Sequence, residues 1–180
     1  ENYTSNPVNR CFFCKQALFK EMEALAADRG VGALLYGENA SDIGDHRPGA
    51  EAARQFKVAA PLKEFGLTKD EIRAWSRALG LPTSEKHEMA CLSSRIPYGE
   101  GVTPEKLHRI EGAEAALRKE GIFGARVRYH ELGAQSLARL ELPPSDFSRV
   151  LDGAIRERLV ASLEALGFDQ VTLDLRGYRR

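Results

Sequence analysis

The stretch from Cys91 to Gly99 places a thiol, two hydroxyls and a guanidinium within five consecutive residues, Cys91 to Arg95. Two turn-prone residues, Pro97 and Gly99, follow. Such a sequence favours neither helix nor strand. It therefore predicts a loop, and loops are where binding and catalytic side chains tend to lie.

Cys11 and Cys14 form a second group of candidate reactive side chains, in the spacing Cys-x-x-Cys. They fall in the first turn of a predicted helix, where free backbone N–H groups and the helix dipole favour thiolate, and hence a metal or redox role. Two small buried thiols are the plainer alternative. A thioredoxin-type motif fits less well, because no strand is predicted before this helix.

The third thiol, Cys91, allows two kinds of metal centre. Three thiolates that leave one coordination position open suit an iron–sulfur cluster with an iron free for an exogenous ligand. His87 lies four residues before Cys91, so Cys11, Cys14, His87 and Cys91 could instead be the four ligands of a closed structural zinc site. The residues alone leave both centres open.

Several charged side chains are candidate ligands for anions. Arg95 in the loop, with Arg126 and Arg128 at i and i+2 of a predicted strand, could form a phosphate-binding cluster. A solvated strand face is the simpler explanation of the two strand arginines. Glu114 lies among alanines, which hints at a crowded interior face of a helix.

Acidic side chains in the polar loop at residues 37–42 are candidate cation ligands. This loop follows a predicted strand, at the position where open α/β sheets bind ligands. Glu38 and Asp42 could coordinate a hydrated Mg²⁺ beside a nucleotide, although two isolated acids are a weak signal. The other histidines, His46, His108 and His130, are expected to be solvated or satisfied rather than ligands.

Composition limits the class of protein. The 180 residues include 26 Lys and Arg against 26 Asp and Glu, so no overall field favours nucleic acid or a membrane surface. No apolar run is long enough for a membrane span, and no signal-peptide pattern opens the chain. Three cysteines do not make a disulfide framework, so a reducing, cytoplasmic compartment is expected.

The hydrophobic pattern predicts an α/β unit that leads into the Cys91 loop and a smaller unit after it. Helices are expected at residues 10–29, over a short stretch that runs through Phe56, and at 69–79, 104–120 and 146–166, the last broken near Gly153. A capping box, Thr68-Lys69-Asp70-Glu71, opens the helix at 69–79, and Thr103-Pro104 caps the helix at 104–120. Strands are expected at residues 31–36, 57–60, 125–131, 135–142 and 170–175.

Particular features of these elements are also predicted. Leu18, Met22 and Leu25 are expected to form the buried stripe of the first helix. The strand at 31–36 is expected to be covered on both faces in a parallel sheet, because it is nearly all apolar. The segments at 125–131 and 135–142 alternate and should pair as an antiparallel hairpin.

Four motifs come in an order that resembles the LarE family of ATP-dependent sulfur transferases. They are Asn6-Pro-Val-Asn-Arg-Cys-Phe-Phe-Cys-Lys15; Gly37-Glu-Asn-Ala-Ser-Asp42 with Arg47-Pro-Gly49; Pro61-Leu62 with Thr68-Lys69 and Ile72-Arg73; and Ala90-Cys-Leu-Ser-Ser-Arg-Ile-Pro-Tyr-Gly99. The resemblance covers most of residues 6–130. The tail from Leu132 to Arg180 matches only in its order of strands and helices.

The resemblance implies a PP-loop ATP pyrophosphatase that serves nickel-pincer nucleotide synthesis for lactate racemase. Members adenylate a pyridinium biscarboxylic acid mononucleotide and deliver sulfur to the activated carboxylate, giving a thiocarboxylate. Some members sacrifice the cysteine that matches Cys91, and others bind a 4Fe-4S cluster through three cysteines. This chain has all three, Cys11, Cys14 and Cys91, which resembles the cluster-dependent kind.

By the same resemblance, further residues gain expected roles. Catalytic roles fall to the three cysteines and Glu114, with the cysteines also as metal ligands. Binding of substrate phosphate and carboxylates falls to Ser94, Arg95, Arg126, Arg128 and Asp146. Binding on the ATP side, with ATP and Mg²⁺ as cofactors, falls to Asn39, Asp42 and Arg47.

The resemblance also sets expectations for the whole chain. Residues 1–95 are expected to be the C-terminal part of a PP-loop domain, and residues 96–180 an α+β domain for sulfur transfer and oligomerisation. The family's phosphate-grasping Ser-Gly-Gly-x-Asp-Ser loop is absent and the chain begins at Glu1, so a fragment unable to adenylate substrate is expected. A homo-oligomer and a sulfide donor are the expected partners, without nucleic acid or membrane. A relative that thiolates tRNA is the alternative enzyme, disfavoured by the balanced charge.

Overall fold

The computed structural model describes residues 2–44, 47–86 and 90–179. The chain divides into two compact units, Glu1–Tyr3 with Pro7–His87 and Thr4–Asn6 with Glu88–Arg180. The predicted domain boundary at residue 95 falls inside the second unit. The assignment of the two parts to particular domain families stays a prediction.

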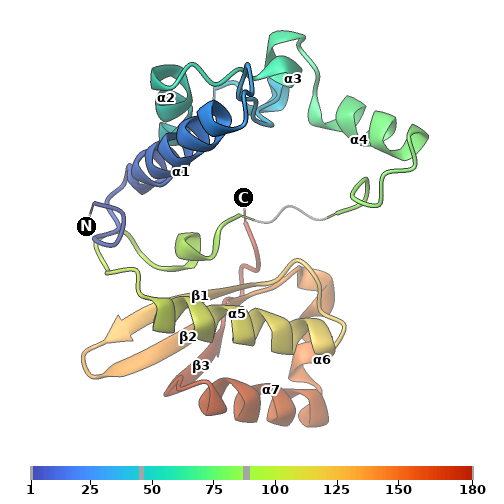
Figure 1. Ribbon diagram of the computed structural model, residues 1–180. Helices are drawn as coiled ribbons and strands as arrows, with labels where there is room; N and C mark the ends of the chain where they lie inside the picture. The colour runs from blue at the N-terminus through green and yellow to red at the C-terminus, as the bar shows by residue number, and fades with distance from the viewer. Residues whose placement is uncertain (1, 45–46, 87–89, 180) are drawn as a thin grey trace. The chain divides into compact units, whose positions relative to one another are not determined.

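The first unit is built mainly from helices, which Figure 1 labels α1 to α4. The helices predicted at 10–29, before Phe56 and at 69–79 are confirmed, whereas the short α3 was not predicted. The elements are α1 (Arg10–Asp28), the 3-10 turn η1 (Ala40–Asp42), α2 (Pro48–Gln55), α3 (Pro61–Glu64) and α4 (Lys69–Ala78).

The buried face of α1 is centred on Phe19. Phe19 is 2% exposed, whereas Leu18 and Leu25 are 52% and 50% exposed. The Phe19 ring centroid lies 6.1 Å from those of both Tyr36 and Phe56, and Met22 packs against the same cluster. The predicted stripe is therefore right for Met22 and wrong for both leucines, because packing against these aromatic rings decides which face of α1 is buried.

The two strands predicted in the first unit reduce to one parallel bridge, between Leu35 and Ala59. The Tyr36 N–H donates to the Ala59 carbonyl and the Ala59 N–H donates to the Leu34 carbonyl, each at 3.0 Å. Leu35 is 58% exposed, and most of the other residues at 31–36 are exposed or half-buried as well. The prediction of a strand covered on both faces is wrong for this structure, since no further strand pairs with the segment among the residues described.

Two helices begin at the caps that their sequences predict. Thr68 accepts from the Glu71 N–H and Glu71 accepts from the Thr68 N–H, so both halves of the capping box at α4 are present. Thr103 Oγ1 accepts from the Lys106 N–H at the start of α5 (Pro104–Lys119). These local bonds fix where each helix starts.

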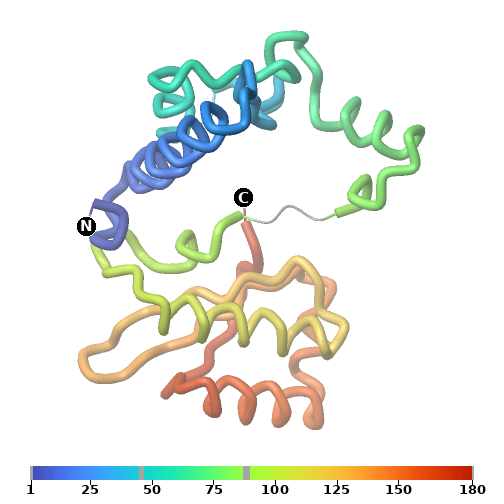
Figure 2. Tube along the Cα trace, viewed as in Figure 1, coloured from blue at the N-terminus to red at the C-terminus, as the bar shows by residue number. Residues whose placement is uncertain are grey.

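The second unit is organised around a three-stranded sheet. β1 (Arg126–Leu132) pairs antiparallel with β2 (Gln135–Glu141), and β2 pairs parallel with β3 (Gln170–Leu173). The predicted hairpin is thus confirmed, and the last strand is two residues shorter than the predicted 170–175. Figure 2 traces the chain from the hairpin through the C-terminal helices back to β3.

The broken helix predicted at 146–166 is confirmed. It consists of the 3-10 turn η3 (Pro144–Asp146), α6 (Phe147–Leu151) and α7 (Gly153–Ala165). Asp152 separates the last two helices, and its side chain accepts from the Ile155 N–H at 3.3 Å to cap α7.

The two faces of the sheet differ in character, because side chains alternate along a strand. Val127, Tyr129, Ala138 and Leu140 lie on the face that α5 and α7 cover, and they are at most 7% exposed. The opposite face carries Arg126, Arg128 and His130 from β1 with Arg139 and Glu141 from β2, and it is here called the arginine face. The helices supply the core of this unit, and the arginine face is the polar side of the sheet.

The predicted fold class is confirmed only at its coarser level. The chain mixes helices with a small three-stranded sheet, and the parallel sheet expected in the first part is limited to the bridge described above. The relationship to PP-loop enzymes stays a prediction. None of the helices formed by the described residues is both long and apolar enough to cross a membrane.

Candidate functional site

The Cys91 loop contains a single 3-10 turn, η2 (Leu92–Arg95), that presents the thiol to solvent. The Cys91 carbonyl accepts from the Ser94 N–H at 3.0 Å, from Ser94 Oγ at 2.8 Å and from Arg95 Nη1 at 3.1 Å. Arg95 Nη1 also donates to the Ala90 carbonyl at 3.0 Å. The backbone on both sides of the Cys91 thiol is therefore fixed by Arg95, while the thiol itself is exposed.

Arg95 is in turn held by Glu114 of α5. Arg95 Nε donates to Glu114 Oε1 at 2.8 Å and Nη2 donates to Oε2 at 3.3 Å, with the two side chains 2% and 8% exposed. Glu114 Oε1 also accepts from the Val127 N–H of β1 at 3.2 Å. These contacts give both residues a role in positioning the Cys91 turn between α5 and β1. Their direct roles toward substrate stay predictions.

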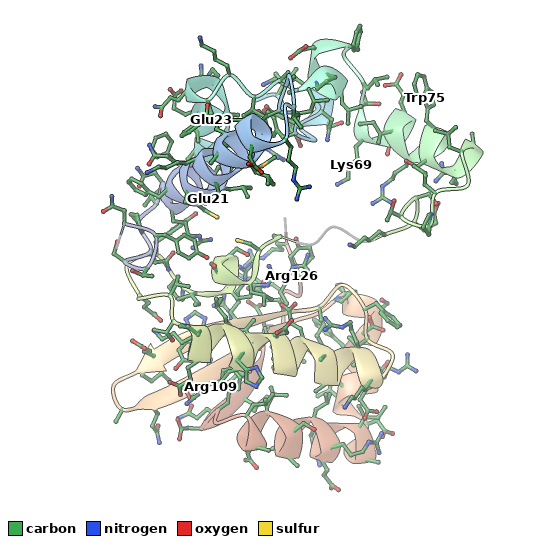
Figure 3. All side chains as sticks on the ribbon, in the orientation of Figure 1. Glu21, Glu23, Lys69, Trp75, Arg109 and Arg126 are labelled. Atoms are coloured by element: carbon green, nitrogen blue, oxygen red, sulfur yellow. The ribbon has the colours of Figure 1, made fainter. Side chains whose placement is uncertain are left out.

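Arg128 connects the same turn to the arginine face. Its Nη1 donates to the Ser94 carbonyl at 2.7 Å and its Nε donates to Glu141 Oε2 at 2.9 Å. Arg126 is 8% exposed, donates to the Ala125 carbonyl at 3.1 Å and lies 5.0 Å from the centre of the Tyr178 ring. Figure 3 labels Arg126 among the side chains of this unit. The structure thus brings Ser94, Arg95, Glu114 and Arg128 into one connected group with Cys91. Arg126 lies on the same face of the sheet as Arg128, two residues before it on β1.

Arg139 and His130 also lie on the arginine face, although the sequence did not single out Arg139 and assigned His130 no role. Arg139 lies directly opposite Arg128 in the hairpin register, and its Nη2 donates to Glu141 Oε1 at 2.9 Å. Burial, then the charges of Arg139 and Arg128, lower the pKa of His130 against the opposing effect of Glu141. The signal available in the sequence was the alternation of residues 135–142, which places residue 139 opposite residue 128 once the turn is fixed.

Asp146 is not joined to this group by any bond among the described residues. It ends η3 and precedes α6, where its side chain makes no capping hydrogen bond. Its predicted role in substrate binding stays a prediction.

Two of the three residues predicted for the ATP side, Asp42 and Arg47, border a cavity of about 480 Å³ within the first unit. Asn39 Oδ1 accepts from the Ser41 N–H at 3.0 Å, Asp42 Oδ2 accepts from the Asn39 N–H at 3.1 Å, and Asp42 Oδ1 pairs with Arg47 Nη2 at 2.6 Å. Asp42 and Arg47 border the cavity directly, and Asn39 braces the turn that carries Asp42. The polar loop is therefore ordered by its own side chains.

Further polar groups border this cavity. Glu38 is 7% exposed and accepts hydrogen bonds from Tyr36 and from Lys63 Nζ, the latter at 3.0 Å. Burial raises the pKa of Glu38, but these two hydrogen bonds and nearby lysines outweigh it and the net pKa is lowered. Burial and the bond to Glu38 raise the pKa of Tyr36. Burial lowers the pKa of Lys15, which lies 4.4 Å from the centre of the Tyr36 ring.

None of the three predicted metal-binding cysteines forms a disulfide. Cys11 and Cys14 lie in the first turn of α1, half-buried and exposed respectively, and Cys91 is exposed. No group of three or more His, Cys, Asp or Glu side chains within residues 2–44, 47–86 and 90–179 is arranged to hold a metal ion. His87, the fourth ligand of the zinc alternative, and His46 lie outside the described residues.

Comparison with known proteins identifies the relatives of this chain. No protein-family model matches it. It is 43% identical over 178 residues to an uncharacterized protein of Synechocystis, and 26% identical over 174 residues to an uncharacterized protein of Methanocaldococcus jannaschii. It is 32% identical over 179 residues to the pyridinium-3,5-bisthiocarboxylic acid mononucleotide synthase of Lactiplantibacillus plantarum. The chain is thus similar, over nearly its whole length, to a member of the LarE family.

The alignments cover nearly all of this chain but only part of each relative. They span 99%, 99% and 97% of the chain and 65%, 63% and 66% of the Synechocystis, L. plantarum and M. jannaschii proteins respectively. The chain thus spans about two thirds of the length of these relatives.

The three cysteines are divided between the two units, with Cys11 and Cys14 in the first and Cys91 in the second. None of them forms a disulfide, and cysteine sulfur is the donor that iron–sulfur clusters use. In chemical type the donor set therefore fits the cluster that the sequence predicts.

Proposed function

We propose that this chain acts in an ATP-dependent sulfur transfer that converts a pyridinium biscarboxylic acid mononucleotide into a thiocarboxylate during nickel-pincer cofactor synthesis. The L. plantarum relative is named as the synthase of the bisthiocarboxylic acid mononucleotide. The observation that carries the proposal is the connected group around Cys91. It places an exposed thiol beside buried and half-buried arginines that suit an anionic substrate.

The chemistry explains why two sites are needed. A carboxylate is a poor electrophile, so ATP first transfers AMP to it, with Mg²⁺ neutralising the phosphates and pyrophosphate leaving. The polar cavity bordered by Asp42 and Arg47, with Asn39 behind it, is proposed as one part of the ATP site for this step, which also requires the phosphate-grasping loop that this sequence lacks. A sulfur nucleophile then attacks the acyl carbon. The new C–S bond replaces the C–O bond to AMP, and AMP leaves with the electron pair.

Residues of the second unit are proposed to hold the substrate during the attack. The arginines Arg126 and Arg128 bind the anionic groups, with the Ser94 hydroxyl beside them. Arg95 and Glu114 keep the Cys91 turn in place, so that the thiol remains at the edge of the anion site. Asp146 is proposed as an additional substrate contact.

Two sources of sulfur are compatible with these residues. We favour a 4Fe-4S cluster that Cys11, Cys14 and Cys91 would hold and that would supply sulfide as the nucleophile, to be replenished by a sulfide donor. The alternative is the sulfur of Cys91 itself. Its thiolate would form a thioester with the substrate, and loss of the Cys91 α-proton with cleavage of the Cβ–S bond would release the thiocarboxylate and leave dehydroalanine. The chain is also proposed to act as a homo-oligomer.

Metal and sulfide analysis after anaerobic purification tests the source of sulfur. We expect the wild-type protein to contain iron and acid-labile sulfide near cluster stoichiometry. Both should be lost in Cys91→Ala and retained in His87→Ala. Zinc without iron, lost in His87→Ala, would replace the cluster with a closed structural site bound by Cys11, Cys14, His87 and Cys91. Mass analysis of residue 91 after turnover distinguishes a sacrificed cysteine.

Sulfur transfer itself is tested by supplying the acyl-adenylate ready-made, which makes the assay independent of the ATP step. We expect wild-type protein carrying sulfide to replace one oxygen of the carboxyl with sulfur, and Cys91→Ser to be inactive. Transfer of sulfur to tRNA instead of the mononucleotide would favour the tRNA-thiolating alternative. Equal activity of wild type and Cys91→Ser would refute the role of this loop.

A further inference from the structure

The arginine face places two guanidinium groups directly opposite each other. The hairpin register pairs Arg128 with Arg139 and Arg126 with Glu141. Like charges directly opposite in adjacent strands destabilise a sheet unless a counter-charge lies between them. Glu141, whose side chain is 9% exposed, supplies it, accepting from Arg128 through Oε2 and from Arg139 through Oε1, both at 2.9 Å.

Glu141 does not cancel the positive charge of this face. The only other carboxylate near Arg139 among the described residues is Asp174, 3.8 Å from its Nε. The pKa of His130 reports the local field: beyond burial, Arg139 and Arg128 lower it, and the opposing effect of Glu141 is smaller. Arg128 and Arg139 thus share the one carboxylate of Glu141, with Asp174 at a longer distance from Arg139.

Both opposed arginines retain unused donors. Arg128 donates hydrogen bonds through Nε and Nη1, and Arg139 donates one through Nη2. Within the part of the chain that the structure describes, Arg128 Nη2 and Arg139 Nη1 therefore have no acceptor. Arg139 Nε is buried and makes no hydrogen bond. The two side chains are 26% and 38% exposed, which leaves them accessible to a ligand.

We propose that Arg139 binds the phosphate of the mononucleotide substrate, at the end of the molecule remote from the reacting carboxyl. This inference rests on the proposed function. Arg128 is bonded to the Cys91 turn through the Ser94 carbonyl, so the carboxyl that receives sulfur lies on that side. Arg139 lies one strand further from the turn, and neighbouring strands are separated by roughly 5 Å. Arg139 is therefore a specificity-determining residue for the phosphate group.

Calorimetric titration with two probes isolates this role. Nicotinic acid mononucleotide carries a carboxylate and a phosphate on a pyridinium ribose, and nicotinic acid riboside lacks only the phosphate. We expect Arg139→Gln to weaken binding of the mononucleotide about tenfold or more, because one charge-assisted hydrogen-bonding group is lost, and to leave binding of the riboside unchanged. The control Arg156→Gln removes the same charge from the exposed surface of α7 and should change neither affinity.

A second variant guards against an effect on folding. Arg139→Lys keeps the charge but not the paired N–H donors, and we expect an affinity for the mononucleotide between those of wild type and Arg139→Gln. Amide exchange of β1 and β2 should be unchanged in both variants.

Three results would overturn the inference. Equal mononucleotide affinity in wild type and Arg139→Gln would refute the role of Arg139 while leaving the proposed function standing. If Arg139→Gln weakened binding of the mononucleotide and of the riboside equally, Arg139 would shape the site without contacting the phosphate. Failure of wild-type protein to bind the mononucleotide at all would refute both the inference and the substrate class of the proposed function.

Discussion

Removing the Glu114 carboxylate should destabilise the second unit severely. Glu114→Ala leaves the Arg95 guanidinium, whose side chain is 2% exposed, without its counter-charge, and also removes the acceptor of the Val127 N–H. Breaking a buried pair by deleting one partner costs about 3–5 kcal/mol. The free energy of unfolding of a domain is about 5–15 kcal/mol, so this single change should remove a large part of it.

A double-mutant cycle separates the ion pair from its neighbours. Arg95→Met with Glu114→Leu removes both charges and replaces them with apolar side chains of similar length. We expect this double variant to be more stable than Glu114→Ala, because a buried pair replaced by apolar groups is often neutral whereas an orphaned charge is not. A coupling energy of about 1–3 kcal/mol between the two sites is expected.

The assay must report on the second unit. Trp75 is the single tryptophan and lies on α4 of the first unit, so its fluorescence is unsuitable, and Figure 3 shows it projecting from that helix. Urea unfolding followed by far-UV circular dichroism, with amide exchange at Val127, is the appropriate measurement. Glu120→Ala, which breaks an exposed pair with Arg158, is the control and should behave as an ordinary surface change. The reasoning would be refuted if the losses in free energy of unfolding for Arg95→Met and Glu114→Leu were additive in the double variant. It would also be refuted if Glu114→Ala lost no more stability than the control.

Three further outcomes follow from local geometry. Gly177→Ala should lower the local stability of the C-terminal segment, measured by amide exchange, by about 1–3 kcal/mol. The reason is that Gly177 has φ +68° and a Cβ there would lie 2.6 Å from the Leu142 carbonyl oxygen. An unchanged exchange rate would contradict this. Thr68→Ala should lower the free energy of unfolding by about 1 kcal/mol, because α4 loses its N-cap, and the unfolding midpoint reported by Trp75 fluorescence should fall. Thr68→Ser keeps a capping hydroxyl and should retain the wild-type midpoint. The lowered pKa of Glu38 in the folded protein means that its stabilisation is present above the ordinary value of 4.5 and is lost as pH falls through the folded pKa. Acid unfolding of Glu38→Gln should therefore depend less steeply on pH than that of wild type, and equal slopes would refute the assignment.

Sequence patterns predicted the features that local interactions decide. The starts of α4 and α5 followed from Thr68 and Thr103, because each cap bonds to a backbone N–H three residues away. The hairpin followed from alternation on both sides of a short turn containing Gly133. The break before α7 followed from Gly153, although the capping residue is Asp152.

Features decided by tertiary packing were predicted less well. Helical spacing allowed Leu18 and Leu25 to be buried as readily as Phe19, and only the contact with Tyr36 and Phe56 selects the latter. An apolar run at residues 31–36 predicted a covered strand, yet it makes one bridge among the described residues.

The candidate site shows the same division. Its residue types could be read from the sequence, since Arg95, Glu114 and Arg128 were each singled out. Their bonds could not, because Arg95 and Glu114 are 19 residues apart and Arg128 reaches a carbonyl 34 residues away. Arg139 was missed because its place opposite Arg128 depends on the hairpin register.

Asn6 has a practical consequence for anyone who separates the two units. It is fully buried, adopts φ +55°, and its amide donates to the carbonyls of Pro97 at 2.6 Å and Glu100 at 2.9 Å, while its own carbonyl accepts from the Gly99 N–H. The loop after the Cys91 turn is thus tied to a residue that precedes most of the first unit, residues 7–87, in the chain. A polypeptide that begins after residue 87 would lose this tie, whereas one that joins residues 4–6 to the second unit through a short linker would keep it.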